Sequence, residues 1–529
     1  MLNKLNFNRL LISSVYFVQG IIGITGLAEF ILTRNAFHFT WLQLGFLGAL
    51  TTLTWCIKPI YGFLTDLLPL FGFRRKSYLI IASLMTSFGY IFLALTGTNF
   101  IVIALASILI SIGLGFSDVI IDGLVIETST HENVGEYQSL CWRAKAVGIF
   151  IASLFSGFLL ERAVFSKLLQ DTFLTHWLVA HFSPAFSNTL IGSINLLDIR
   201  YILLCTALLP FIVFVFTLLF KETVALPQKH SFPSKHILTA VFAFLLSTLI
   251  VLWALTSKQW IPGLKNESIS ALAIILIWST WIFSYFLHLI KMKMATLALL
   301  YASLFLFLWR FTPSFGAPWS DYFINTLKLS QEKLGFIATL SSLSWIIGSY
   351  IYNKYLDKIP LKKLLFWTVT IGVLLSFSQL TIATPTLANT LGNFFLIKYF
   401  AAIMLYPVYF FGYHQAAWQV LMAQPGILNL DATLSFFLET MFIISFLPLL
   451  KLAALVTPKG VEATNFSVLA SVMNLGLAFG SISGAWIYTY IEGTHHLAGI
   501  TFTGLHLTII IGALTSLICL VFINKIDTA

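Results

Sequence analysis

The chain has 529 residues, of which 58% are apolar and only 9% are charged. Soluble domains carry roughly 25% charged residues, so this chain has too few charges to cover a surface that faces water. These figures exclude an ordinary soluble enzyme, a disordered chain and a small disulfide-linked protein. The composition predicts an all-α, polytopic membrane protein.

The net charge of +10 comes from lysines and arginines that stand singly between apolar runs. This scatter is typical of the loops that orient a membrane protein, and we expect no nucleic-acid partner. The four cysteines are far apart and form no CxxC pair, so we expect no metal site and no cofactor. The first apolar stretch, from Leu10 to about Leu32, is too long for a signal peptide and predicts a first membrane span.

Apolar runs near the roughly 20 residues that cross a bilayer follow one another along the chain. The first six form a predicted N-terminal six-helix bundle, residues 1–221: 10–33, 41–64, 77–97, 100–126, 137–161 and 199–220. Two more, 237–256 and 269–290, predict extra transmembrane helices in a central linker, residues 222–293. The C-terminal helix bundle, residues 294–529, contains the remaining runs: 295–323, 333–353, 363–383, 432–455, 463–490 and 500–523.

One further apolar run, 394–422, is interrupted by Pro407, Gly412 and His414. A hairpin, a re-entrant element and a full span all remain possible for it. With the N-terminus inside, 17 loop lysines and arginines fall on the cytoplasmic side and seven on the opposite side. This bias predicts that both termini are cytoplasmic. An even number of crossings follows, so 394–422 should not cross just once.

An internal repeat links the two halves. Residues 43–55 read QLGFLGALTTLTW and residues 333–345 read KLGFIATLSSLSW, with six of 13 positions identical at an offset of 290. Each copy precedes a loop that contains an aspartate and several bases. Repeated halves of the same orientation predict two bundles related by an axis along the membrane normal, which is a transporter architecture.

The few charges inside predicted spans are the candidate functional residues, because each costs at least about 2.5–3.5 kcal/mol at the centre of a bilayer. Asp118 and Asp122 lie four residues apart on one helical face, which Ser111 and Gly115 extend. This stripe predicts a face toward a cavity, although a helix end that reaches interfacial water is the alternative. Arg143, at the start of the next span, could pair with either carboxylate as part of the site or as a purely structural salt bridge.

Two predicted spans contain both a base and a helix breaker. Lys58 precedes Pro59 in the second span, and Arg310 precedes Pro313, Gly316 and Pro318 in the run 295–323. Interrupted helices in corresponding halves mark the binding sites of transporters, so we expect a break at both places.

Further candidates are polar residues on small-residue faces. Gln19 lies with Gly23 and Gly26 on one face of the first span. The run 463–490 has a stripe of serine, alanine and threonine that helix packing explains. Helix packing does not explain the polar side chain of Asn474 in this stripe or the charge of the neighbouring Glu462, so both are candidate site residues.

Other chemistry has little support in the sequence. The spacing of Asp118 and Asp122 resembles half of the metal-diphosphate site of membrane prenyltransferases, but no second DxxxD is present. No Walker A sequence occurs, so ATP hydrolysis is not expected as the energy source.

Four stretches together resemble the folate-biopterin transporter family, a branch of the major facilitator superfamily. They are YFVQGIIGITGLA at 16–28, IKPIYGFLTDLLPLFGFRRKSYL at 57–79, SDVIIDGLVIE at 117–127 and PKGVEATNFSVLASVMNLG at 458–476. The resemblance implies uptake of folates or pterins driven by protons or another ion gradient. It also implies that five residues are critical for transport: Lys58, Asp118, Asp122, Arg143 and Glu462.

The loop between the second and third spans resembles the conformational latch of the superfamily, carried here by Gly62, Asp66, Gly72, Arg74 and Arg75. The chain departs from the family pattern at Gly123, where alanine is usual, and in lacking a base shortly after Glu127.

We therefore expect a proton-coupled symporter in the inner cell membrane that imports folate or pterin by alternating access, without enzymatic activity. Its partners would be the small-molecule substrate, protons and the lipid bilayer. Transport of another metabolite, such as a nucleotide or S-adenosylmethionine, is the first alternative. An integral-membrane prenyl- or glycosyltransferase and a nontransporting relative are alternatives of other classes.

Overall fold

The structure is a computed structural model. It describes residues 4–67, 69–128, 134–182, 185–222, 234–257, 266–291, 297–313, 316–356, 358–455, 462–497 and 500–525. The chain divides into two compact units. Unit 1 consists of Met1–Gln43, Leu50–Phe244 and Ser330–Gly335, and unit 2 consists of Leu44–Ala49, Leu245–Leu329 and Phe336–Ala529.

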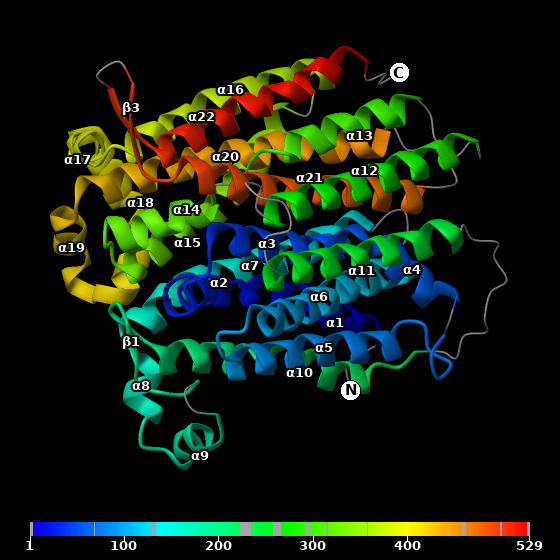
Figure 1. Cartoon of the computed structure of the whole chain (residues 1–529), viewed down its shortest axis with the longest axis horizontal. Coiled ribbons are helices and arrows are strands. Elements are labelled where there is room, and N and C mark those ends of the chain that lie inside the picture. Colours follow the sequence, from blue (N-terminus) through cyan, green and yellow to red (C-terminus); the bar gives the residue numbers. More distant parts are fainter. Residues whose placement is uncertain are drawn as a thin grey trace. The chain divides into compact units, whose positions relative to one another are not determined.

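Unit 1 consists of helices and one short hairpin. Its elements in chain order are α1 (Lys4–Ile21), the 3-10 turn η1 (Ile22–Ile24), α2 (Thr25–Phe30), the π-helix η2 (Ile31–Ala36), most of α3 (Trp41–Cys56), α4 (Lys58–Leu67), α5 (Lys76–Leu95), α6 (Phe100–Thr128), α7 (Val134–Glu161), α8 (Val164–Leu169), α9 (Phe173–Phe182), β1 (Leu190–Ile191), β2 (Ile194–Asn195), α10 (Leu196–Leu219), the first part of α11 (Ser234–Thr256) and the first turn of α15 (Gln331–Ile351). Within it, α1 packs against α7, and α5 packs between α6 and α10 (Figure 1).

Unit 2 is also helical, with one antiparallel hairpin. Its elements are the second part of α11 (Ser234–Thr256), α12 (Asn266–Lys291), α13 (Leu297–Arg310), α14 (Gly316–Asp321), the π-helix η3 (Tyr322–Thr326), most of α15 (Gln331–Ile351), the π-helix η4 (Tyr352–Leu356), α16 (Leu361–Ile382), α17 (Pro385–Gly392), α18 (Phe395–Tyr413), the 3-10 turn η5 (His414–Ala416), α19 (Ala417–Ala423), α20 (Gly426–Leu455), α21 (Glu462–Ile491), β3 (Thr494–Leu497), β4 (Ile500–Thr503), α22 (Gly504–Ser516) and the 3-10 helix η6 (Leu517–Lys525). Here α13 packs against α21, and α16 packs against α20 and α22.

The all-α, polytopic membrane fold predicted from composition is confirmed. Among the described residues, 11 helices are long and apolar enough to cross a membrane, by length and composition. Large apolar side chains stay exposed on these helices, for example Phe92 on α5 at 59% and Leu374 on α16 at 65%. Such a surface is expected for helices whose outer faces contact lipid.

Both predicted helix breaks are present. The second predicted span divides at Ile57 into α3 and α4, and the run 295–323 divides after Arg310 into α13 and α14. Neither run therefore counts as one continuous span. The run 394–422 forms α18 followed by the shorter α19, with a turn at His414 where φ is 49°. The helix α18 is long enough to cross alone, whereas the seven residues of α19 reach only about 10 Å.

The internal repeat extends well beyond the matching letters, at the same offset of 290. His38 and Lys328 both adopt left-handed backbone conformations, with φ of 54° and 51°. The π-helix before each of them closes with equivalent backbone hydrogen bonds: Phe37 N to Leu32 O at 3.0 Å, Phe39 N to Thr33 O at 3.0 Å, Leu327 N to Tyr322 O at 2.8 Å and Leu329 N to Phe323 O at 3.0 Å. The hydroxyls of Thr40 and Ser330 then cap α3 and α15.

Glycines allow the first helix of each repeat to approach its neighbour closely. A Cβ on Gly20 of α1 would lie 2.2 Å from the carbonyl oxygen of Lys145 on α7. A Cβ on Gly476 of α21 would lie 2.5 Å from the carbonyl oxygen of Phe307 on α13. Small residues at helix crossings are typical of membrane bundles.

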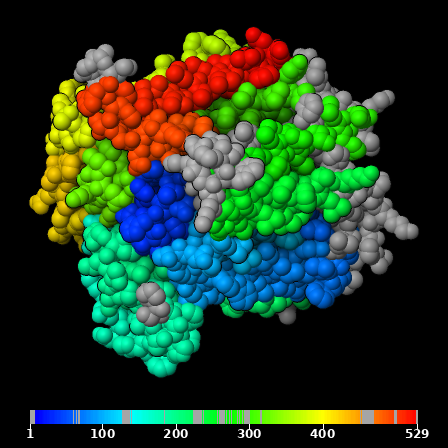
Figure 2. Space-filling view, in the orientation of Figure 1, coloured from blue at the N-terminus to red at the C-terminus, as the bar shows by residue number. Residues whose placement is uncertain are grey.

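The segment between α7 and α10 projects from the rest of unit 1 as α8 and α9 (Figure 2). Its inner side rests on the bundle, because Leu178 packs with Leu197 and Tyr201, and the hydroxyls of Thr175 and Tyr201 are 2.6 Å apart. This small cluster fixes α9 against the start of α10.

Candidate functional site

An ion pair between two helices of unit 1 is the centre of the candidate site. Nζ of Lys58, the first residue of α4, lies 2.6 Å from Oδ2 of Asp118 on α6. The other oxygen of Asp118 accepts a hydrogen bond from Nε2 of Gln19 on α1 at 3.1 Å. Asp118 is only 6% exposed. Both of its oxygens are therefore satisfied by groups from two other helices, as a buried carboxylate requires.

The break between α3 and α4 aims Lys58 at this carboxylate. Ile57 leaves the helical conformation, with φ of −95° and ψ of 14°, and α4 restarts at Lys58 with Pro59 in its first turn. Proline is tolerated there because the first amides of a helix have no intrahelical partner. The Lys58 ammonium also lies 4.6 Å from the centre of the Trp55 ring. One side chain thus makes an ion pair and a cation–π contact.

The second carboxylate, Asp122, has a different partner. The hydroxyl of Tyr16 on α1 donates to Oδ1 of Asp122 at 2.6 Å. Lys145 of α7 interacts electrostatically with both Asp118 and Asp122. No salt bridge joins Asp122 to a base in the described part of the chain, so its hydrogen-bond partner is a neutral hydroxyl and not a cation.

The ion pair that the structure shows at Asp118 is with Lys58, whereas the sequence had offered Arg143 as a possible partner. Lys58 occupies the oxygen of Asp118 that a base could reach, and the Arg143 side chain is exposed. The reason is the helix break, which brings Lys58 onto the acidic face of α6. Sequence spacing along α7 gave no indication of that contact.

The stripe on α6 is covered by neighbouring helices for half of its length, which differs from the prediction of a cavity-facing stripe. Ser111 accepts a hydrogen bond from Nε1 of Trp55 at 3.1 Å and lies 2.6 Å from the Thr54 hydroxyl. A Cβ on Gly115 would lie 3.4 Å from the nearest carbon of the Tyr61 ring, so this glycine packs against the ring. The half of the stripe at Ser111 and Gly115 therefore fastens α6 to α3 and α4, and the other half holds the charges.

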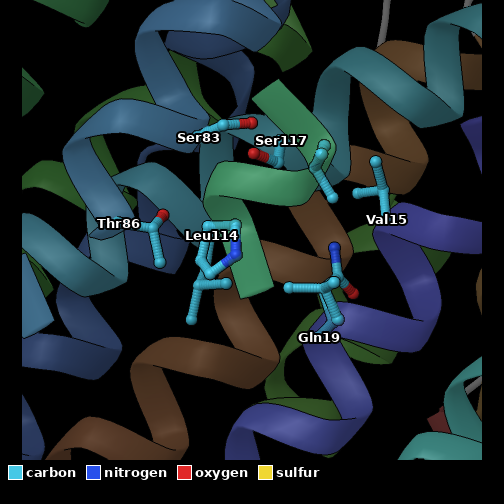
Figure 3. Close-up of a pocket in the computed structure, with 9 residues that line it drawn as sticks. Val15, Gln19, Ser83, Thr86, Leu114 and Ser117 are labelled. Atoms are coloured by element: carbon cyan, nitrogen blue, oxygen red, sulfur yellow. The ribbon is translucent and has the colours of Figure 1, made fainter. Parts of the chain in front are cut away.

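A small pocket lies beside this site. It is lined by Val15 and Gln19 of α1, Ser83 and Thr86 of α5, and Leu114 and Ser117 of α6, among others (Figure 3). Its free volume of about 10 Å³ compares with roughly 300–1,000 Å³ for small-molecule pockets. The pocket is therefore a packing gap behind Asp118 and not a substrate cavity.

The predicted latch loop forms a tight turn after α4. Phe71 and Gly72 both have positive φ, and Phe73 N donates to Leu70 O at 3.0 Å. The buried Arg75 guanidinium donates to the Thr65 hydroxyl at 2.8 Å. A Cβ on Gly123 would lie 2.6 Å from the Arg75 guanidinium carbon, so this glycine makes room for the arginine.

Glu222 holds the same loop, and the sequence analysis did not select it. Its carboxylate accepts hydrogen bonds from the backbone amides of Arg74 at 2.9 Å, Arg75 at 3.0 Å and Lys76 at 2.7 Å. These amides open α5, where a negative charge interacts favourably with the helix dipole. Glu222 is 146 residues from Lys76, so no local pattern could have revealed the contact.

The other predicted site residues do not join this cluster. Gly62 packs beside Val119, within the latch region. Arg310 and Asn474 lie in unit 2, on α13 and α21. Asp66 and Glu462 belong to α4 and α21, and their side chains lie outside the described residues. The structure thus brings Gln19, Lys58, Asp118 and Asp122 together from three helices.

Sequence reasoning also missed Tyr16, Lys145 and Glu439. Glu439 lies in the predicted span 432–455, where an isolated charge is the signal that singled out Asp118. Tyr16 could not be recognised because a tyrosine in a span is usually an interface anchor. Among the described residues, no group of three or more histidine, cysteine or acidic side chains could hold a metal ion.

The chain matches known transporters along most of its length. It is 27% identical over 528 residues to the folate-biopterin transporter of Synechocystis sp., covering 99% of this chain and 82% of that protein. It is 24% identical over 525 residues to folate transporter 1 of Plasmodium falciparum, covering 98% and 79%. Both relatives are named as transporters, and this protein is a membrane transporter rather than an enzyme.

Solved transporters have the same fold. A peptide transporter of the POT family in complex with a thioalcohol-conjugated peptide superposes with a TM-score of 0.60 at 13% identity, covering 98% of this chain and 96% of that one. A bacterial homologue of the human lysosomal transporter Spinster, inward-facing and unoccupied, gives a TM-score of 0.53 at 14% identity, covering 99% and 96%. The family model described as BT1 family matches residues 19–169, 175–392 and 432–528. With most of its length matched, the chain belongs to the BT1 family.

Proposed function

We propose that this protein is a secondary active transporter that imports folates or pterins by alternating access, coupled to proton movement. The observation that carries the proposal is the pair of carboxylates on α6, one bound to Lys58 and the other hydrogen-bonded to a tyrosine hydroxyl. Relatives that match nearly the whole chain bear the names folate-biopterin transporter and folate transporter. We also propose an inner cell membrane location with both termini cytoplasmic, as the loop charges favour.

The cargo chemistry suits these residues. Folate combines a flat heterocycle that carries hydrogen-bond donors with an anionic glutamate tail. In this proposal Asp118 exchanges its bond with Lys58 for donors on the heterocycle, and Lys58 is released toward an anionic group. Gln19 then holds Asp118 in place, because its Nε2 already donates to that carboxylate. Arg143, Arg310, Asn474 and Glu462 are proposed to affect transport from outside this cluster.

Asp122 is the proposed carrier of the coupling proton. Asp122 accepts a hydrogen bond from the neutral hydroxyl of Tyr16. This hydrogen bond can form when the Asp122 carboxyl group is charged, and, after rotation of the Tyr16 hydroxyl, also when it is protonated. Asp118, in contrast, is held charged by the adjacent ammonium. The two carboxylates would therefore have separate roles, substrate recognition and proton coupling.

Uptake measurements test the proposal. The protein is expressed in a host that requires folate and has no folate carrier, and entry of labelled folate is followed with and without a proton uncoupler. We expect uptake that the uncoupler reduces at least several-fold. Asp122→Asn should retain substrate binding but lose the response to the uncoupler. Asp171→Asn is the matched control, because Asp171 is exposed in the connection between α8 and α9.

Absence of folate uptake by the unmodified protein would overturn the proposed cargo. Competition by a nucleotide or by S-adenosylmethionine in place of folate would then favour transport of that metabolite. Folate uptake that the uncoupler leaves unchanged in both the unmodified protein and Asp122→Asn would overturn proton coupling alone.

A further inference from the structure

Unit 2 contains an acid and a base joined by a row of aromatic rings. Nε1 of Trp345 on α15 donates to Oε2 of Glu439 on α20 at 2.9 Å. The Trp345 ring centre lies 5.8 Å from that of Phe442, which lies 5.9 Å from that of Trp309. The Arg310 guanidinium carbon is 5.5 Å from the centres of both Phe442 and Trp309. The rings therefore lead from the carboxylate to the guanidinium.

Neither charge is neutralised by another side chain in the described ranges. Within them, no salt bridge involves Arg310 or Glu439. The Arg310 guanidinium lies over the rings of Trp309, Phe442 and Phe446. The Glu439 carboxylate accepts a hydrogen bond from Trp345. An ionised group in a membrane span is expensive unless it is paired or hydrogen-bonded. Cation–π contacts compensate only part of that cost for an arginine.

These side chains lie at the edge of the core and not inside it. Phe305 and Leu306 of α13 are fully buried, and with Leu449 and Leu452 they belong to one apolar cluster. Trp309 packs against this cluster and is half-buried, as are the other four residues: Arg310, Trp345, Glu439 and Phe442. The charged ends and ring edges are thus only partly covered, while Phe442 stacks between Trp309 and Phe446.

The backbone around Arg310 is tightly constrained. A Cβ on Gly476 of α21 would lie 3.0 Å from the Arg310 Cβ, and one on Gly480 would lie 2.6 Å from the carbonyl oxygen of Thr312. Close helix contact at these two glycines, four residues apart, fixes α13 where it ends. The backbone that carries the Arg310 side chain is therefore rigid, which favours a binding role for the guanidinium over that of a mobile surface charge.

We propose that Glu439, Trp345, Phe442, Trp309 and Arg310 form a second subsite, in unit 2 and separate from the Lys58–Asp118 pair of unit 1, for a flat heterocycle with hydrogen-bond donors at one end and an anionic group at the other. Glu439 accepts from the amino and ring N–H groups, the aromatic rings stack on the heterocycle, and Arg310 meets the anion. Carboxylates accept such paired donors well, and charged partners strengthen each hydrogen bond. This inference rests on the proposed function, whose cargo has both ends.

Two partial ligands allow the two ends of the subsite to be tested independently. A pterin without the glutamate has only the donor-bearing heterocycle, and p-aminobenzoylglutamate has only the anionic part. Binding of each to the purified full-length protein is measured by thermal shift and by competition with labelled folate. For Glu439→Gln we expect pterin affinity to fall roughly tenfold or more, with p-aminobenzoylglutamate unchanged. For Arg310→Gln we expect the opposite pattern.

Trp345→Phe refines the test, because it removes the donor to Glu439 and keeps an aromatic ring. It should weaken pterin binding less than Glu439→Gln does. Trp367→Phe is the matched control, since Trp367 of α16 is 51% exposed and its ring contacts Phe366, which is not a subsite residue.

The outcomes distinguish this inference from the proposed function. Equal loss of both partial ligands in Glu439→Gln, or no loss of either, would overturn the subsite even if the unmodified protein takes up folate. No binding of pterin by the unmodified protein would also overturn it. Partial-ligand binding with the expected pattern but no folate uptake would support the subsite and overturn only the proposed transport of folate.

Discussion

The ammonium of Lys58, at the break between α3 and α4, and the carboxylate of Asp118 on α6 form an ion pair of 2.6 Å. The break is what permits the contact, because a continuous helix would carry Lys58 past the acidic face of α6. Gln19 completes the arrangement from α1. The pair therefore ties together the three helices that hold the candidate site.

The first prediction concerns the two charges of this pair. Lys58→Met leaves Asp118 buried without its base, and we expect a loss of about 3–5 kcal/mol of stability, because an unpaired buried charge is strongly unfavourable. The double variant Lys58→Met with Asp118→Asn should recover most of the thermal stability but not the uptake. Melting temperature in detergent and folate uptake are measured for both. Recovery of uptake in the double variant would show that the pair is only structural.

The second prediction concerns the contact between α1 and α7. Gly20→Ala places a methyl group 2.2 Å from the carbonyl oxygen of Lys145, which is backbone and cannot move away easily. We expect a loss of about 1–3 kcal/mol, as for overpacked cores. Gly26→Ala on α2 is the matched control, because no atom lies within 4 Å of its Cβ position. Similar melting temperatures for the two variants would contradict the close contact.

The repeat illustrates what a sequence can and cannot predict. The 13 matching residues predicted equivalent halves, and the composition predicted the membrane helices. The equivalent left-handed turns at His38 and Lys328 could not be foreseen, because positive φ is uncommon for any residue other than glycine. Their conformation follows from the way each π-helix ends and the next helix begins.

The candidate site was predicted only in part, for a physical reason. An isolated charge in an apolar run reveals that a side chain has a polar environment, and this identified Lys58, Asp118 and Asp122. It does not reveal which helix supplies the partner. The choice of Lys58 over Arg143 and the contacts of Glu222 depend on packing between segments far apart in the chain, which one sequence does not encode as a local pattern.

The third prediction concerns Glu222. Its carboxylate accepts from three amides at the start of α5, so Glu222→Ala should cost about 0.5–2 kcal/mol, the range for a lost helix cap. Because the same amides belong to the latch loop, uptake should fall more than stability alone explains. Lys221→Ala, at the adjacent exposed residue, should change neither quantity. Unchanged uptake in Glu222→Ala at normal expression would remove the loop from the transport cycle.

The fourth prediction concerns the end of α7. Arg162 makes a two-pronged contact with Glu332, at 2.9 Å and 3.2 Å, and Glu161 accepts from the Ser330 hydroxyl and the Glu332 amide. All four residues belong to unit 1, whereas α15 continues into unit 2 after Gly335. We expect the first turn of α15 to separate from the end of α7 during alternating access, which breaks these contacts, since packed elements switch between discrete arrangements.

Crosslinking tests this expectation. In a background in which the exposed Cys205 is replaced by serine, cysteines are introduced at Arg162 and Glu332 and joined with a short bifunctional reagent. We expect the crosslink to abolish at least nine-tenths of uptake and a reducible reagent to allow recovery after reduction. The same pair without reagent, and each single cysteine with reagent, should retain uptake near that of the background. Full uptake in the crosslinked protein would mean that the end of α7 and the first turn of α15 move together throughout the cycle.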